Sequence, residues 1–260
     1  MTNLEKNIKL VKNIKRFAVE EMGITPNKSF EKVISSEEFY CLYVSQQDKI
    51  ESIFDIPEDG EFLGDNKDAA EMRRRIFSKE GYHTLLFSFE GYGGEECQIS
   101  QSLLKDSTCR LAYVVLHENF HTHREKKELN LELCIEEAVG NYFAYQASLI
   151  YFKKHDKKVI PYVESDFKWM LKYGDFVNKY LELLNKAYSE NKLEKAKELL
   201  FDAEIEAREL GSNEEINNAF FLREKNYYAK QIEVFKALKN TQPQDYVRDT
   251  TLLLKLLEGI

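Results

Sequence analysis

The feature that most constrains this chain is an apolar run ending in His-Glu-x-x-His, Leu111 to His121 (LAYVVLHENFH). Residues four apart on a helix lie one turn above each other, so His117 and His121 are expected to direct both imidazoles to one point. Glu118 then lies about 100° around the helix. This arrangement is typical of zinc hydrolases, whose histidines bind the metal while the glutamate acts as general base.

A zinc site needs a third protein ligand, because the metal prefers a tetrahedral set of donors with one position left for water. The nearest candidate lies in CIEEAVGN, on a second predicted helix. A short polar turn, Thr122 to Asn130, is expected to fold this helix back antiparallel to the first. The order of motif, turn and Glu-bearing helix is the gluzincin pattern.

The segment EEAVGN resembles the NEAxxD segment of thermolysin-like enzymes. This resemblance selects Glu137, rather than Glu136, as the third ligand. In those enzymes the residue four after the glutamate is an aspartate that orients the first histidine, and the matching residue here is Asn141. Its amide can still accept the imidazole N–H, but it brings no charge.

Two other interpretations use the same residues. The histidines could be a satisfied structural pair, since short motifs also occur by chance. Glu118-x-x-His121 is also half of a di-iron bundle motif, which needs a second copy. The other copy, Glu80-x-x-His83, contains Gly81 and runs into a predicted strand, so its side chains would not share a helix face. The zinc interpretation is therefore favoured.

Composition favours a soluble, helix-rich protein. At 260 residues the chain can bury a substantial core in one or two domains, and it has only 11 glycines and 4 prolines. The net charge of −8 argues against nucleic acid and anionic membranes as partners. No run of 18 apolar residues predicts a membrane span, and the amino terminus does not resemble a signal peptide.

The four cysteines indicate a reducing compartment. They show no Cys-x-x-Cys spacing and fall in predicted strands and helices or at their edges, so reduced, packed thiols are expected. The sequence therefore predicts a cytoplasmic location. The cysteines are Cys41, Cys97, Cys109 and Cys134.

The first half of the chain predicts a small sheet with flanking helices. Asp65 or Asn66 can cap the second helix and Gly81 can end it, whereas PEDGEFLG reads as a turn. Asp106 or Ser107 can cap the motif helix. The helices are expected at 4–22 and from 68 to Gly81, and the strands at 37–45, 49–56 and 82–90.

The second half predicts helices almost throughout. A capping box, Ser212-x-x-Glu215, follows Gly211 and indicates a helix start. We therefore expect an α+β, mostly helical, zincin-like fold, with an amino-terminal α/β lobe (1–130) and a helical lobe (131–260) that carries the third zinc ligand. The helices are expected at 131–153, 165–188, 191–210, 213–239 and 245–258.

Through most of its length the chain resembles the bacterial predicted-aminopeptidase family of zinc metallopeptidases. The similar segments are IKRFAVEEMGI, FDIPEDGEFLG, HENFH and INNAFFLREKNYY. The resemblance carries an Asn-Asn-Ala segment and a following tyrosine onto Asn217, Asn218, Ala219 and Tyr227. Tyr92 matches a family tyrosine, while the rest of GYGGEECQISQSLL departs from the family pattern.

The resemblance implies a zinc-dependent aminopeptidase acting on peptides. Gluzincins usually stabilise the oxyanion with a Tyr or His of the carboxy-terminal lobe, which here implies Tyr227, with Tyr228 and Tyr92 as alternatives. A substrate amine needs a carboxylate, and Glu90, Glu95 and Glu96 flank the glycine-rich break. Asn217 is expected along the substrate cleft. A non-peptidase zinc hydrolase and an inactive metallopeptidase-like binding protein remain the alternatives.

Overall fold

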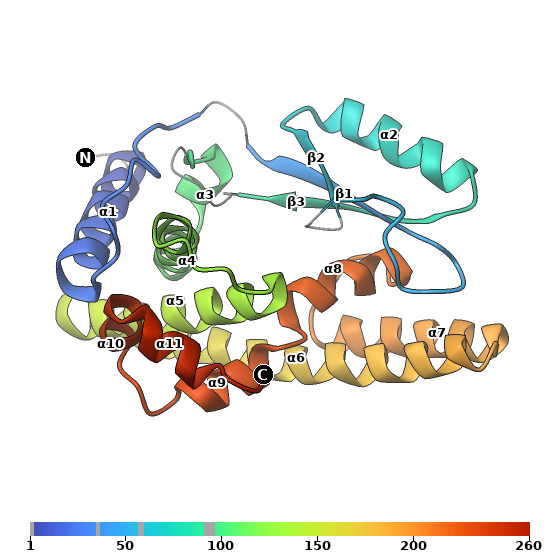
Figure 1. Ribbon diagram of the computed structural model, residues 1–260. Coiled ribbons are helices and arrows are strands. Elements are labelled where there is room, and N and C mark those ends of the chain that lie inside the picture. Colours follow the sequence, from blue (N-terminus) through green and yellow to red (C-terminus); the bar gives the residue numbers. More distant parts are fainter. Residues whose placement is uncertain (1–2, 35–36, 57–59, 91–96) are drawn as a thin grey trace. The chain divides into compact units, whose positions relative to one another are not determined.

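The computed structural model describes all residues except 1–2, 35–36, 57–59 and 91–96. Most described residues are helical, and a small three-stranded sheet accompanies them, which confirms the α+β class (Figure 1). The chain forms two compact units. Unit 1 comprises 1–38, 89–168 and 230–260, and unit 2 comprises 39–88 and 169–229. The expected lobe boundary at residue 130 lies inside unit 1.

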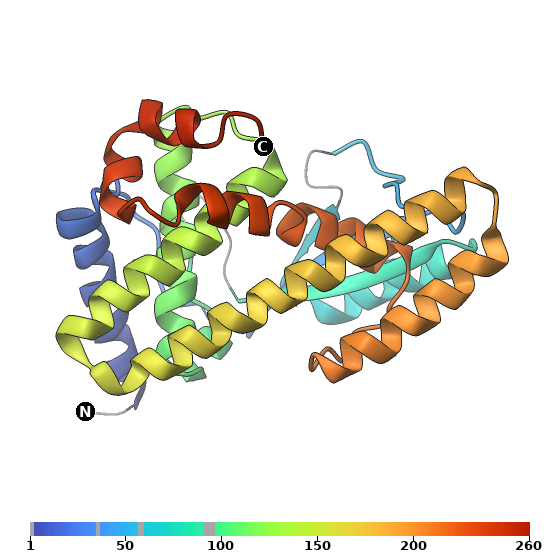
Figure 2. The ribbon, with the colours of Figure 1, turned by 90° about the horizontal axis from the view of Figure 1, so that it is seen from below.

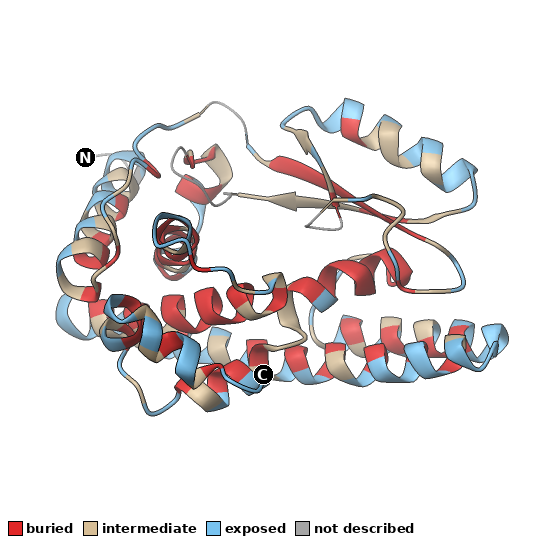
Figure 3. Ribbon diagram, viewed as in Figure 1, coloured by how far each residue is buried: buried red, intermediate tan, exposed pale blue. Residues whose placement is uncertain are grey.

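Unit 1 is built around two packed helices, α4 and α5. Helix α4 also packs against α1, and α5 packs against α9. Both central helices are buried over most of their length (Figure 3). The elements of unit 1 are α1 (Asn3–Phe17), η1 (Ala18–Met22), α3 (Gln101–Lys105), α4 (Thr108–Lys126), α5 (Leu133–His155), η2 (Lys157–Val159), the start of α6 (Ile160–Ser189), α9 (Gln231–Leu238), α10 (Pro243–Arg248) and α11 (Thr250–Leu256).

Helix α4 begins where the sequence predicts. Ser107 caps it by accepting a hydrogen bond from the Arg110 N–H. The helix continues to Lys126, so the turn expected at Thr122 to Asn130 begins only after Lys126. In Figure 1 α4 is seen end-on while α5 lies in the plane of the picture, and in Figure 2 the two again run in different directions. They therefore cross, and the expected antiparallel pair is wrong.

Unit 2 contains the sheet, with strand order β2-β1-β3 and an antiparallel β1/β2 pair. Helices α2 and α8 pack against β1 from opposite faces (Figure 1). All seven residues of β1 are consequently buried. The elements are β1 (Phe39–Ser45), β2 (Gly60–Gly64), α2 (Lys67–Lys79), β3 (His83–Phe89), most of α6, α7 (Leu193–Glu209) and α8 (Asn218–Tyr228).

The second strand lies later in the chain than the sequence predicts. The aromatic and β-branched segment 49–56 forms no strand, because Ser45 at the end of β1 holds it in a turn by donating to the carbonyls of Lys49 and Glu51. The residues Gly60–Gly64, expected in a turn, pair with β1 instead. The other strands and α2, capped by Asn66, confirm the prediction.

Three expected helices are interrupted. Residues 18–22 form a π-helical turn after α1. The expected helix at 213–239 instead begins at Asn218, because the Asn217 side chain accepts the N–H groups of Ala219 and Phe220, and it stops at Tyr228 before α9. The helix start predicted from the capping box Ser212-x-x-Glu215 is therefore wrong. Asp249 separates α10 from α11 by capping the latter.

The described residues include no helix both long enough and apolar enough to cross a membrane. All four cysteines are free and buried, as the sequence predicts. The expected thiols therefore contribute to packing.

Candidate metal centre

Three side chains of unit 1 converge where the sequence predicts a metal site. His117 and His121 come from α4, and Glu137 comes from the first turns of α5. All three are at least 90% buried. Because α4 and α5 pack against each other, the i, i+4 spacing of the histidines brings both rings to the carboxylate.

The donor atoms have the spacing that a small metal ion requires. The two Nε2 atoms lie 2.9 Å apart. The oxygens of Glu137 lie 3.2 Å from Nε2 of His117 and 3.4 Å from Nε2 of His121. Donors about 2.0–2.1 Å from a tetrahedral zinc are roughly 3.3 Å from each other. The two contacts of Glu137 match this spacing, so the three residues can hold a metal ion.

Glu136 contacts the opposite edge of the His121 ring. Its Oε1 lies 2.6 Å from Nδ1 of His121, and the residue is 3% exposed. A carboxylate accepts only, so Nδ1 carries a proton, and Nε2 is the ring nitrogen that faces Glu137. The sequence indicates Glu136 only as a competing ligand, so this role was not predicted. The sequence signal for this role was the pair of adjacent glutamates, Glu136 and Glu137, on the helix that follows the His-x-x-x-His pair.

His117 is positioned differently. Gly140 lies against its ring, and a Cβ at that position would be 3.2 Å from Cε1 of the imidazole. The ring also stacks on Tyr113, with centroids 5.8 Å apart. Among the described residues Nδ1 of His117 has no hydrogen-bond partner. Asn141 instead accepts from the Tyr113 hydroxyl, so the expected bond from His117 to Asn141 is wrong.

The electrostatics of the site favour positive charge at its centre. Burial alone lowers the pKa of His121, but Glu137 and the hydrogen bond to Glu136 outweigh it and raise that pKa well above its ordinary value. Burial likewise opposes ionisation of Glu137, yet His121 and His117 hold the pKa of Glu137 well below its usual range. A site of this polarity attracts a cation.

Glu118 is the carboxylate left beside the three converging groups. It is less buried than the two histidines. Burial raises the pKa of its carboxyl above the ordinary value, against the charges of His117 and His121. A carboxyl with a raised pKa is suited to accepting and returning a proton near neutral pH.

Glu90 lies in the same unit and is bound by Arg110. Arg110 Nε donates to Glu90 Oε2 at 3.2 Å. Burial raises the pKa of Glu90, while Arg110 opposes this change. Arg110 belongs to α4, so this contact ties Glu90 to the helix that carries the motif. Three further candidates for the substrate site, Tyr92, Glu95 and Glu96, lie outside the described residues.

The remaining candidates belong to unit 2. Asn217 is the amino-terminal cap of α8, and its amide also donates to the Thr84 carbonyl. The Tyr227 hydroxyl lies 3.4 Å from that of Tyr43, a residue whose pKa burial raises well above its ordinary value. Tyr228 packs edge-on against Tyr173. The roles expected for Asn217 and Tyr227 at the metal centre stay predictions.

A second buried ionic cluster is centred on Arg223 of α8. It was not predicted from the sequence. Arg223 Nη1 is 2.8 Å from Glu214, its Nη2 is 2.5 Å from Glu224, and its guanidinium covers the Phe87 ring at 3.9 Å. Glu224 is fully buried. Burial raises the pKa of Glu224 to about 7, against the charge of Arg223.

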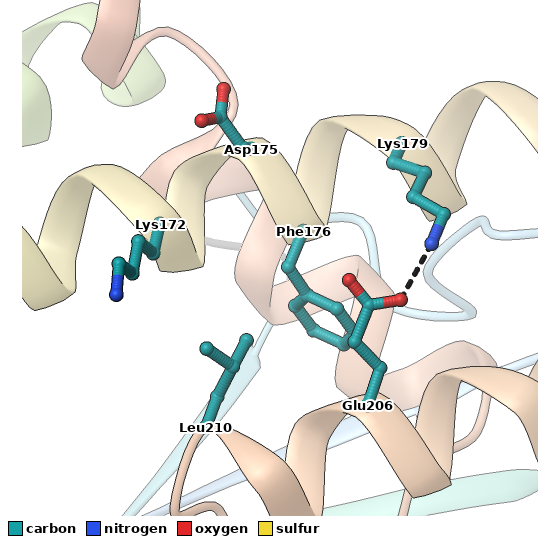
Figure 4. A pocket seen from close by; sticks show the side chains of 6 residues that line it. All are labelled: Lys172, Asp175, Phe176, Lys179, Glu206 and Leu210. Atoms are coloured by element: carbon teal, nitrogen blue, oxygen red, sulfur yellow. Dashed lines mark hydrogen bonds and ion pairs between the residues drawn. The ribbon is translucent and has the colours of Figure 1, made fainter.

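Unit 2 also has a surface groove of about 310 Å³ between α6 and α7 (Figure 4). Its lining is mainly charged, and Lys179 forms an ion pair with Glu206 at 2.5 Å across it. No group of metal-binding side chains was found there among the described residues. The group of metal-binding side chains in the described residues is the one on α4 and α5.

No protein-family model, curated protein or solved structure matches the chain. The resemblance to the bacterial predicted-aminopeptidase family therefore stays a prediction from the sequence.

Proposed function

We propose that the protein is a zinc-dependent peptidase. The observation that carries this proposal is the convergence of His117, His121 and Glu137, with Glu118 adjacent in the same motif. Two imidazoles and one carboxylate form the donor set of catalytic zinc sites, which leave a fourth position for water.

The ligands and the general base have separate roles. His117, His121 and Glu137 would hold zinc, which when bound supplies a Lewis acid and a water of lowered pKa. Glu118 would accept a proton from the attacking water and return it to the leaving amine. Its raised pKa and partial exposure support this role.

Aminopeptidase action is the proposed form of this activity. Glu90 would bind the free amine of a peptide, in exchange for its contact with Arg110. The resemblance supports Tyr227 as the residue that would donate a hydrogen bond to the oxyanion, and Tyr92 and Asn217 as residues that would contact the substrate. The four free, buried thiols support a cytoplasmic location for this enzyme.

Metal content and turnover test the proposal together. Purified protein should contain about one zinc by mass spectrometry, and His117→Ala, His121→Ala and Glu137→Ala should each lose it. Glu118→Gln should keep the zinc but lose about 10²–10⁴ in turnover on a library of amino-acid and peptide amides. Glu125→Gln, an exposed change on the same helix, is the matched control.

Three outcomes would separate the alternatives. A wild-type protein that binds no zinc contradicts the proposal entirely. Zinc binding with hydrolysis of esters or other non-peptide bonds alone indicates a different zinc hydrolase. Zinc binding with no turnover of any substrate, and peptide binding unaffected by Glu118→Gln, indicates an inactive binding protein.

A further inference from the structure

We propose that Glu136, backed by Arg124, is the positioning residue of the metal centre and acts through His121. The inference rests on the proposed metal site. Oε1 of Glu136 lies 2.6 Å from Nδ1 of His121 and 2.9 Å from Nε of Arg124. One carboxylate oxygen thus contacts both a proposed ligand, through a hydrogen bond, and a cation, through an ion pair that lacks hydrogen-bond geometry.

The local structure explains this contact. His121 and Arg124 are three residues apart on α4, so they share a helix face. Glu136 comes from the first turn of α5, which packs on that face. A 3% exposed carboxylate needs partners to offset its lost hydration, and these two groups supply them.

Glu136 and Glu137 contact opposite edges of one imidazole. Glu137 lies 3.4 Å from Nε2 of His121, whereas Glu136 lies 2.6 Å from Nδ1. Adjacent helical residues point about 100° apart, which allows this division. Glu136 fixes the tautomer that leaves Nε2 free to bind metal, and its negative charge makes Nε2 a stronger donor.

The other proposed histidine ligand has no such partner. His117 is placed by Gly140 and Tyr113, which contact the ring without accepting its Nδ1 proton. Within the described residues, Glu136 is therefore the charged group on which the orientation of a histidine ligand depends. Losing Glu136 should weaken the centre although all three metal ligands remain.

A competing explanation is that Glu136 and Arg124 only fasten α4 to α5. A structural tie would lower the stability of the metal-free protein and leave the zinc affinity of folded molecules unchanged. A positioning role instead lowers the zinc affinity of folded molecules and leaves the stability of the metal-free protein unchanged. The two are separated by measuring the zinc Kd by chelator competition and the thermal midpoint of the metal-free protein.

Glu136→Ala should weaken zinc binding about 10- to 100-fold, the usual effect of removing a group that orients a ligand, whereas Glu136→Gln, whose amide oxygen can still accept the Nδ1 proton, should weaken it by less. The matched control Glu125→Gln should bind zinc as the wild type does. Arg124→Gln should weaken binding by less and should add nothing in the Glu136→Ala background, because it acts through Glu136. Arg124→Gln also provides a second route if Glu136→Ala folds poorly.

A spectroscopic measurement isolates the hydrogen bond. In the wild type the Nδ1 proton of His121 should give a downfield, slowly exchanging proton resonance, which Glu136→Ala should abolish and Glu125→Gln should retain. Unchanged zinc affinity in Glu136→Ala, or persistence of that resonance in the same variant, would overturn the inference while leaving the zinc site intact. Absence of zinc binding by the wild type would instead refute the proposed function and this inference with it.

Discussion

The two compact units each bury an ionic cluster, and the clusters differ in where their positive charge comes from. On α8 of unit 2 the cation is Arg223, which contacts Glu214 and Glu224. On α4 and α5 of unit 1 two carboxylates, Glu136 and Glu137, surround imidazoles. A guanidinium is always charged, whereas an imidazole can be neutral and leave a lone pair for a metal.

This difference separates a structural cluster from a binding site. A guanidinium has donors only, so Arg223 offers no ligand atom, and its single charge lies against the carboxylates of Glu214 and Glu224. In unit 1 the two Nε2 atoms, 2.9 Å apart, both face the Glu137 carboxylate. Burial by itself is thus no indicator of function, because the decisive property is whether lone pairs converge.

Removing the internal cation should produce the largest effect. Arg223→Met leaves the buried carboxyl of Glu224 without its partner, and breaking a buried ion pair in this way costs about 3–5 kcal/mol of unfolding free energy. Urea denaturation at pH 8 measures the change. Arg208→Met, which removes an exposed arginine paired with Glu204, should cost at most about 1 kcal/mol. If Arg223→Met also lost at most about 1 kcal/mol of unfolding free energy, the ion pair between Arg223 and Glu224 would not be needed for stability.

Adding zinc should stabilise only through the cluster of unit 1. At a free zinc concentration about 100 times Kd, the wild type should gain about 2.7 kcal/mol. His121→Ala and Glu137→Gln should lose this gain, whereas Arg223→Met should keep it because its cation is internal. Denaturation with zinc and with chelator gives the difference. Equal stabilisation of His121→Ala would place the metal elsewhere.

Much of the metal centre could be predicted from sequence because its ligands follow helical spacing. His117 and His121 are one turn apart, so any helix through them brings the rings together. Glu137 followed from resemblance to a known segment. The role of Glu136 could not be predicted, since it depends on how α4 and α5 cross. The periodicity of each helix sequence does not determine that crossing angle.

Fold errors arose where tertiary contacts override local pattern. The segment 49–56 has strand-like composition, yet Ser45 draws it into a turn. The helix expected through 213–239 continues the apolar period, but Asn217 starts a new helix and the chain leaves unit 2 after Ala229. Contiguous lobes were expected for the same reason: periodicity identifies buried faces, but it does not say which segments bury them together.

The smallest effect should be the pH dependence of the cluster in unit 2. Burial raises the pKa of Glu224 to about 7, while an unfolded glutamate titrates near 4.5. Between these values the folded state binds a proton that the unfolded state has lost, so unfolding free energy falls as pH rises. The stability contribution of Glu224 is fully present below about pH 4.5, and its loss should amount to about 1 kcal/mol between pH 6 and 7. Glu224→Gln cannot ionise, so it should lack this decline relative to the wild type. Urea denaturation of both proteins across pH 5–8 gives the difference, from which the other titrating groups cancel. Parallel curves would mean that Arg223 keeps Glu224 ionised throughout, and the cluster of unit 2 would then be a permanent ion pair.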